Sequence, residues 1–331
     1  MNWHIFFLDL ALRGLIISSV AAVAVWKLRG RKRIVTASFA LCVLLILPAA
    51  QMLPRWQVTM PDLATAVEKV TSLSASWKIP VAIWSVGFLL IAARLLPGWI
   101  TLQKWKRKSA RATKMRLLAE ARDAALTLDL HPVPEVRVTS WRTMPAACGF
   151  WHGTVFLPED ALQWSPEQLR MVLLHELAHL KRRDPGMQAL GHLACALHWF
   201  NPFVWMLHRT WMREREMACD ALVLSTGVAP RGYAMHLVDI AEKFRSLLRQ
   251  PLPSAAMAGP GLEQRVRTIL QYVPRPRGKR RGFAVGVLLS ACALVTAAAT
   301  FLPAPYTPLP ATPEEVEVQT RLSADPFPAE P

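Results

Sequence analysis

Four apolar stretches dominate the sequence, and each is long enough to cross a lipid bilayer. They cover residues 5–26, 34–53, 79–100 and 283–302, and a helix needs about 20 apolar residues to cross the hydrocarbon core. Of the 331 residues, 53% are hydrophobic, which excludes a disordered protein. We therefore expect an α-helical polytopic membrane protein with four spans.

A cleaved secretory signal peptide is the alternative interpretation of the first stretch. No Lys or Arg precedes it, whereas a cluster of basic residues follows it at 27–33. Signal peptides have the opposite arrangement, with positive charge in front of the apolar region. We therefore predict a span that stays in the protein.

The excess of basic residues predicts the orientation of the spans. The chain has 39 Lys and Arg against 23 Asp and Glu, a formal net charge of +16. Basic residues gather next to the spans at 27–33, 104–116 and 275–281, and such segments stay in the cytoplasm. Both termini are then outside. Because topology accounts for the charge and the chain is very apolar, we expect no direct contact with nucleic acid.

This topology divides the chain into four parts. Residues 1–100 would hold three transmembrane helices, with an outer loop at 54–78. Residues 101–281 would form a cytoplasmic α+β domain, and 282–302 the fourth transmembrane helix. The last part, 303–331, is rich in Pro and Glu and is expected to be a disordered outer tail.

One helix of the cytoplasmic domain carries a metal-binding motif. Ser165 predicts the start of this helix as its N-cap, and the sequence at 184–186 breaks it. Between them, His175 and His179 lie four positions apart, which places both on one side of the helix, as two ligands of one Zn²⁺ require. Glu176 could act as a base toward a water molecule that the metal activates. Surface histidines are the alternative, but the apolar neighbours indicate a buried helix.

A second helix, starting near Asn201, is predicted to supply the third ligand. Glu216 and Asp220 share one of its faces. The Glu216 carboxylate could complete the ligand set, and Asp220 could bind the outer nitrogen of a histidine ligand and fix its tautomer. Glu214 is the nearest competitor for the third ligand, and a solvated run of charges at 213–216 is the alternative interpretation.

The apolar stretch 187–206 lies between the two metal-binding motifs. Hydropathy alone would make it a fifth span, but a single crossing would separate His175 from Glu216 by the membrane. We therefore expect a buried or re-entrant helical segment that dips into the membrane interface. Three histidines are expected to be interior or interfacial groups rather than ligands, namely His192, His198 and His208. His208 could also contact a tetrahedral intermediate.

Two β-rich segments precede the first motif, at 135–139 and 153–157. A small sheet beside the metal-binding helix could offer its edge to an extended peptide substrate. A purely structural hairpin is the alternative.

The order of the spans and three segments resemble a known family. The segments are LLHELAHLKRRD at 173–184, NPFVW at 201–205 and EREMACDALVL at 214–224. They are similar to the membrane metallopeptidase family of antirepressors, which includes the beta-lactam-sensing signal transducers. The resemblance implies a cytoplasmic zinc metallopeptidase domain of the gluzincin type. It also assigns the site residues, with zinc ligands His175, His179 and Glu216 and the catalytic base Glu176.

The family resemblance implies a membrane-bound zinc endopeptidase in signal-regulated proteolysis. Its substrate would be a cytoplasmic transcriptional repressor, the chain itself, or both. The resistance sensors of the family carry a penicillin-binding domain after the last span, whereas only the Pro-rich residues 303–331 follow here. We therefore expect the signal to enter through the outer loop, the tail or a partner protein. The expected location is the plasma (inner) membrane, and a homodimer stays an open alternative.

Two other functions remain as alternatives. Zinc proteases of the prenyl-protein or quality-control type share both motifs, but they usually place spans between them. A non-catalytic transmembrane signal transducer would use the zinc fold only as a structural hub. Glu176 argues against the transducer, because a structural metal site needs no general base.

Overall fold

The computed structural model describes the chain in six segments, which are residues 3–28, 30–50, 78–140, 144–149, 153–243 and 261–273. The predicted fourth span at 282–302, the tail at 303–331 and almost all of the outer loop at 54–78 lie outside the described residues. The described part is mostly helical and contains one small sheet.

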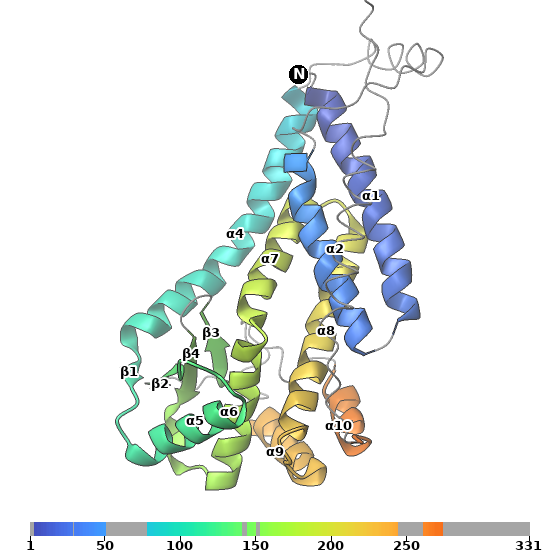
Figure 1. Cartoon of the computed structure of the whole chain (residues 1–331). Coiled ribbons are helices and arrows are strands. Elements are labelled where there is room, and N and C mark those ends of the chain that lie inside the picture. The colour runs from blue at the N-terminus through green and yellow to red at the C-terminus, as the bar shows by residue number, and fades with distance from the viewer. Residues whose placement is uncertain are drawn as a thin grey trace, which may run out of the picture.

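Three long helices form one end of the molecule: α1 (Trp3–Lys27), α2 (Arg31–Ala50) and α4 (Lys78–Lys108). By length and apolar composition, each could cross a membrane. They correspond to the first three predicted spans. α1 and α2 pack side by side on the right of Figure 1. α4 lies on the left of that view and continues down to the sheet.

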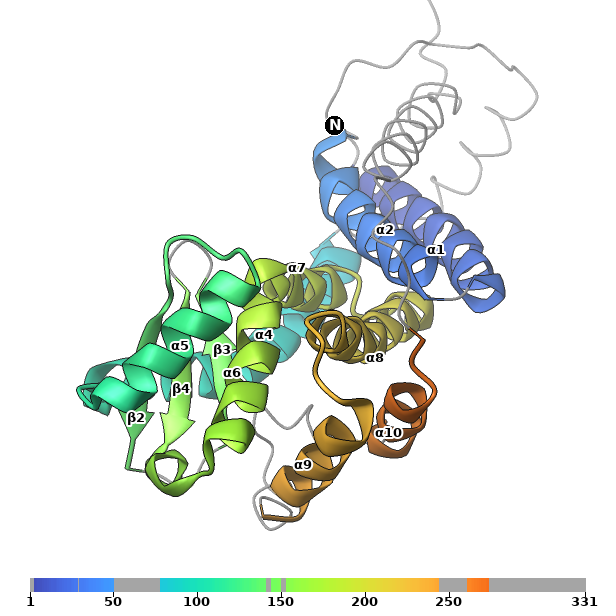
Figure 2. The ribbon, with the colours of Figure 1, turned by 60° about the horizontal axis from the view of Figure 1, so that its bottom comes forward.

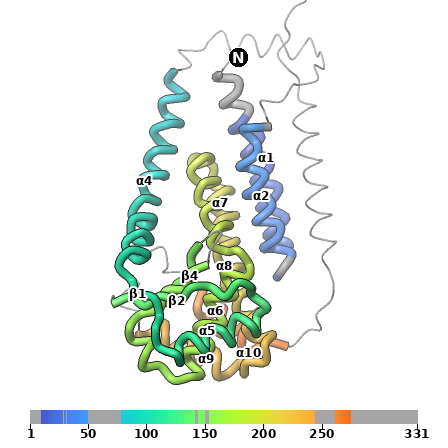
Figure 3. The backbone as a smooth tube through the Cα atoms, turned by 60° about the vertical axis from the view of Figure 1, so that its left-hand side comes forward, coloured from blue at the N-terminus to red at the C-terminus, as the bar shows by residue number. Residues whose placement is uncertain are grey.

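A helical hairpin lies between α4 and the α1–α2 pair (Figure 3). It consists of α7 (Asp184–Leu197) and α8 (Pro202–Leu224), which are joined by residues 198–201. Asn201 caps α8, because its side chain accepts a hydrogen bond from the backbone nitrogen of Phe203. The stretch 187–206 therefore contains most of α7, the turn and the first residues of α8, and the chain reverses its direction within this stretch.

Polar side chains fasten the tip of this hairpin to the long helices. The buried Asn201 amide donates to the Ser18 hydroxyl of α1 over 2.9 Å. Nε2 of His198 lies 3.0 Å from a backbone carbonyl of α2, and the Trp84 indole of α4 donates to the last backbone carbonyl of α7 over 3.1 Å. The tip is thus bound to α1, α2 and α4.

The other end of the molecule is built around a sheet with the strand order β1-β2-β4-β3. The strands are β1 (Ala110–Arg111), β2 (Glu135–Thr139), β3 (Ala146–Cys148) and β4 (Thr154–Pro158). α5 (Met115–Thr127) and α6 (Pro166–Lys181) cover one face of the sheet (Figure 2). On the other face, Trp105 at the end of α4 packs against Phe156, with 5.8 Å between ring centroids.

The two predicted strands are confirmed as β2 and β4, but the hairpin alternative is wrong. β2 and β4 pair in parallel, so the chain must cross over between them, and β3 lies on this connection. β3 pairs antiparallel with the far side of β4. Its sequence Ala-Ala-Cys lacks the β-branched and aromatic side chains that indicate a strand, which is why the sequence did not predict it.

Two further helices, α9 (Pro230–Lys243) and α10 (Leu262–Leu270), complete the central core. α9 and α10 pack against each other and contact α6 and α8, respectively. The predicted start of α6 is confirmed, because the Ser165 hydroxyl accepts a hydrogen bond from the backbone nitrogen of Gln168. α6, α8, α9 and α10 share one hydrophobic core with α5 and the sheet. This core fixes the metal-binding helix in place.

Gly87 allows α4 to approach the hairpin closely. A Cβ at this position would lie 2.1 Å from the Trp199 ring. We expect Gly87→Ala to lower the free energy of unfolding by about 1–3 kcal/mol, the usual cost of overpacking. The control is Gly232→Ala in α9, where the nearest atom lies at 3.6 Å and Ala should be neutral or slightly stabilising. Thermal unfolding in detergent measures both, and equal melting temperatures would contradict this packing.

Candidate metal centre

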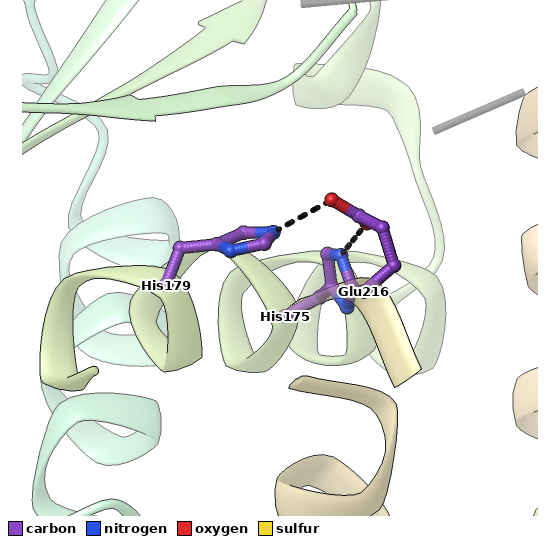
Figure 4. A group of neighbouring side chains, drawn as sticks. All are labelled: His175, His179 and Glu216. Atoms are coloured by element: carbon purple, nitrogen blue, oxygen red, sulfur yellow. Dashed lines mark ion pairs between the residues drawn. The ribbon is translucent and has the colours of Figure 1, made fainter. Parts of the chain in front are cut away.

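Two core helices bring three potential metal ligands together. His175 and His179 lie one turn apart on α6, and Glu216 approaches them from α8 (Figure 4). Nε2 of His175 lies 3.6 Å from Oε2 of Glu216, and Nε2 of His179 lies 3.9 Å from Oε1 of the same carboxylate. All three side chains are buried. The structure thus assembles the three residues that the two sequence motifs indicated.

The unpaired atoms of this group fit a cation. Ligand atoms around a tetrahedral Zn²⁺ with bonds of about 2.0–2.1 Å lie roughly 3.3 Å from one another, slightly closer than the separations observed here. Among the described residues, Nε2 of His175, Oε2 of Glu216 and Oε1 of Glu176 are buried without a hydrogen-bond partner. Buried polar atoms rarely stay unpaired, so a metal ion would satisfy the two that belong to the predicted ligands.

Hydrogen bonds orient His175 through its other ring nitrogen. Nδ1 of His175 lies 2.9 Å from the Tyr233 hydroxyl, which in turn donates to Oδ1 of Asp220 over 2.7 Å. The hydroxyl proton is used by Asp220, so Nδ1–H of His175 must donate to the Tyr233 oxygen. Nε2 then carries the free lone pair that a metal requires. The predicted place of Asp220 beside a histidine is also observed, since Oδ1 lies 3.4 Å from Nδ1.

His179 is oriented in a similar way by a different acid. Its Nδ1 lies 3.0 Å from Oδ2 of Asp184 and 3.2 Å from Sγ of Cys219. His179, Asp184 and Cys219 could in principle hold a metal themselves. Burial raises the pKa of the Cys219 thiol well above its ordinary value, and Asp184 adds to this shift. The thiol therefore stays protonated and donates to Asp184, so the three residues form a hydrogen-bond network around His179.

Buried arginines neutralise the negative charges of the two α8 carboxylates in the site, Glu216 and Asp220. Arg265 of α10 binds both oxygens of Asp220, over 2.8 and 2.7 Å, and Arg215 donates to Oε1 of Glu216 over 2.6 Å. Burial alone would raise the pKa of both carboxyls. The surrounding imidazole and guanidinium groups outweigh burial and hold the pKa of Glu216 and of Asp220 well below the ordinary range. Both side chains are therefore ionised at neutral pH.

The interpretation of 213–216 as a solvated run of charges is wrong, because Glu214, Arg215 and Glu216 are all buried. Glu214 turns toward the α1–α2 pair and forms an ion pair of 3.0 Å with Arg33. The geometry therefore favours Glu216 over Glu214 as the third ligand.

A cavity of about 920 Å³ opens beside two of the three candidate ligands, His179 and Glu216. Glu176, His179 and Glu216 line one wall, and β3, the lower part of α4 and the start of α7 form the others. Glu176 is therefore placed between the candidate ligands and a space that could hold part of a peptide. Burial raises the pKa of the Cys148 thiol in this cavity to about 11, so it is neutral at physiological pH.

The three histidines that were predicted to be interior or interfacial groups lie outside the ligand group. His198 and His208 are buried, as predicted for interior groups, and His198 anchors the hairpin tip. The rings of His192 and His208 lie 4.7 Å apart. Of these two, His192 lines the cavity and His208 does not.

Comparison with known proteins agrees with this geometry. Residues 15–269 match the family described as BlaR1 peptidase M56. The chain belongs to this family. The resemblance seen in the sequence is thereby confirmed, and with it the character of a membrane metallopeptidase related to signal transducers; peptidases of the M56 family are zinc metalloproteases.

A characterised relative covers part of the chain. The regulatory protein BlaR1 of Bacillus licheniformis is 28% identical over 145 residues, which are 44% of this chain. The matched region is 24% of that protein, so the chain spans about a quarter of the relative's length.

Three residues around the candidate centre of this M56 chain were not predicted as part of it: Asp184, Tyr233 and Arg265. Asp184 was interpreted only as a helix break, although its place five residues after His179 allows it to reach the ring. Tyr233 and Arg265 lie on separate helices far along the chain, and nothing in their local sequence indicates their role.

Tyr233→Phe tests the network around His175. The substitution leaves an oxygen of the buried Asp220 and Nδ1 of His175 without their common partner, so we expect a loss of about 1–3 kcal/mol in the free energy of unfolding. Tyr272→Phe is the matched control, because Tyr272 packs only at the margin of the same core. Chemical denaturation of both variants measures the difference. Equal stability of the two would show that the hydroxyl is not needed.

Proposed function

We propose that this chain is a membrane-bound zinc endopeptidase that acts in signal-regulated proteolysis. One observation carries the proposal: beside His179, Nε2 of His175 and Oε2 of Glu216 are buried without a hydrogen-bond partner among the described residues. Glu176, His179 and Glu216 also line one cavity. We assign His175, His179 and Glu216 as the zinc ligands, Glu176 as the catalytic base and Asp220 as an orienting residue. Two histidines of one helix and a glutamate of a later helix would make this a gluzincin-type domain.

Zn²⁺ held by these ligands would supply a Lewis acid that polarises the scissile carbonyl and lowers the pKa of a water molecule. Glu176 would take a proton from the attacking water on its free Oε1 and transfer this proton to the leaving amine. The buried position of Glu176, which is 2% exposed, keeps this proton away from bulk solvent. Tyr233 and Asp184 would hold the two imidazoles in the required tautomer.

The outer edge of strand β3 is an argument for a peptide as the substrate. In the described sheet, β3 is an outer strand that pairs with β4 on one side. Its residues Ala146, Ala147 and Cys148 line the same cavity as Glu176. An extended peptide could add to this edge through backbone hydrogen bonds, and the small side chains of β3 leave room for its backbone. The scissile bond would then lie next to Glu176.

We propose a cytoplasmic transcriptional repressor, the chain itself, or both as substrate. The name of the relative, a regulatory protein, supports a role in regulation. The basic segments at 27–33 and 104–116 support a peptidase domain of residues 101–281 on the cytoplasmic side of the plasma membrane. α1, α2 and α4 would be three of four spans, with the fourth at 282–302.

We also propose that the α7–α8 hairpin is re-entrant. Its tip is fastened between helices that are apolar enough to be spans. Several large apolar side chains on the hairpin are exposed, as expected for contact with lipid, namely Leu190, Leu193, Phe200 and Met206. From this tip, α7 and α8 both run back to the part of the molecule that contains the sheet (Figure 1). This arrangement favours the regulatory peptidase over the prenyl-protein or quality-control class, which usually has spans between the two motifs.

Glu176→Gln should retain zinc and lose peptidase activity. The amide cannot accept the proton from water, so we expect cleavage of the repressor or of the chain to fall by at least about 100-fold. Glu167→Gln is the matched control, because Glu167 lies in the exposed first turn of the same helix. Immunoblots of cells that carry each variant measure the fragments, and metal analysis measures zinc. A Glu176→Gln variant that still cleaves would refute the assignment.

Glu176→Gln and its control Glu167→Gln also test the alternative that the protein is a non-catalytic signal transducer. If the zinc fold were only a structural hub, Glu176→Gln would keep the transcriptional response to the inducing signal. We expect instead that the response is lost together with cleavage.

Labelling of engineered cysteines tests the orientation and the hairpin. We expect Arg231→Cys to react with a membrane-impermeant maleimide only from the cytoplasmic side, because α9 belongs to the peptidase domain. Phe200→Cys at the hairpin tip should not react from the outside, since a re-entrant tip stays within the membrane. The protein without an engineered cysteine is the control, because it measures the background labelling of the native cysteines. Outside labelling of Phe200→Cys would show that the hairpin crosses the membrane.

A further inference from the structure

α10 buries a charged side chain although it is a short helix at the margin of the core. Its two buried residues are Ile269, which is part of the main hydrophobic core, and Arg265, which is only 3% exposed. A buried guanidinium is costly unless its donors are paired. The partners of Arg265 therefore decide whether α10 can pack here at all.

These partners are the two acidic residues of the candidate metal centre. Nε and Nη2 of Arg265 bind the two oxygens of Asp220 over 2.8 and 2.7 Å, and Nη1 lies 3.3 Å from Oε2 of Glu216. The planar guanidinium donates in several fixed directions at once, which a lysine cannot do. One side chain thus contacts both the proposed third ligand and the residue that orients His175.

Glu216 and Asp220 lie one turn apart on α8, and both are buried and ionised. Without a cation between them, the two like charges would repel each other in a medium that stabilises charge poorly. Arg215 donates a hydrogen bond to Oε1 of Glu216. Among the described residues, Asp220 receives its guanidinium hydrogen bonds from Arg265. Loss of Arg265 would therefore allow Asp220 to turn away, and His175 would lose its orientation.

We propose that Arg265 is a positioning residue of the metal centre, and that the centre is complete only while α10 is docked on α8. The proposal rests on the proposed zinc-binding function.

Zinc affinity of the full-length protein in detergent tests this role. Competition with a chromophoric chelator should show that Arg265→Met lowers the affinity about 10- to 100-fold, as is usual for loss of a residue that orients metal ligands. Arg265→Lys should lie between Arg265→Met and the wild type. Arg267→Met is the matched control and should bind zinc like the wild type. Arg267 lies on the same helix, is exposed and, among the described residues, forms its ion pair with the exposed Glu263.

A spectroscopic measurement separates positioning from folding. In the Co²⁺-substituted protein, we expect the visible bands to shift in Arg265→Lys and to stay unchanged in Arg267→Met, since only the former alters the ligand geometry. If Arg265→Met does not fold, the comparison of Arg265→Lys with Arg267→Met decides the question. Wild-type affinity and wild-type bands in Arg265→Lys, or wild-type affinity in a folded Arg265→Met, would overturn the role of Arg265. A wild-type protein that binds no zinc would instead overturn the proposed function.

Discussion

The burial of ionisable side chains where α6, α8 and α10 meet is the constraint on which this structure depends. Each buried ion costs several kcal/mol unless a counter-charge or hydrogen bonds compensate it. Here Asp220 is held by Arg265 and Tyr233, and Glu216 by Arg215 and Arg265. At this junction, Nε2 of His175, Oε2 of Glu216 and Oε1 of Glu176 are buried without a hydrogen-bond partner in the described part of the chain. The surrounding core thus builds a site that a cation would complete, and the match to the M56 family agrees with this interpretation.

The candidate centre lies between two parts of the molecule. α6 packs on the sheet and α5, whereas α8 is fastened to the α1–α2 pair. At the tip of the hairpin, Asn201 binds Ser18, and two residues before Glu216, Glu214 binds Arg33. Glu216 is thus connected through α8 both to the α1–α2 pair and to the core that holds the two histidines.

The cavity lies at the same junction. Its walls come from the edge strand β3, from α6 and from the lower part of α4, which continues a helix apolar enough to cross the membrane. A peptide bound there would lie close to the membrane surface. Under the proposed function, both a membrane-tethered substrate and a cytoplasmic protein are compatible with this position.

The sequence by itself determined the features whose signals are local. Apolar stretches predicted α1, α2 and α4 because a span needs only a continuous run of apolar residues. The spacing of His175 and His179 placed both on one side of α6, since residues four apart always share a helix face. Ser165 and Asn201 predicted the starts of their helices, because capping involves only the next few residues.

Only the tertiary structure decided which distant residues complete the site. The sequence had suggested Glu216 and Asp220, but their contact with the histidines depends on how α8 packs against α6. Tyr233 and Arg265 came from helices with no recognisable motif, and the parallel pairing of β2 with β4 left no periodic signal. Such contacts join residues far apart in the chain, and they are selected by the packing of the whole core rather than by local conformational preference.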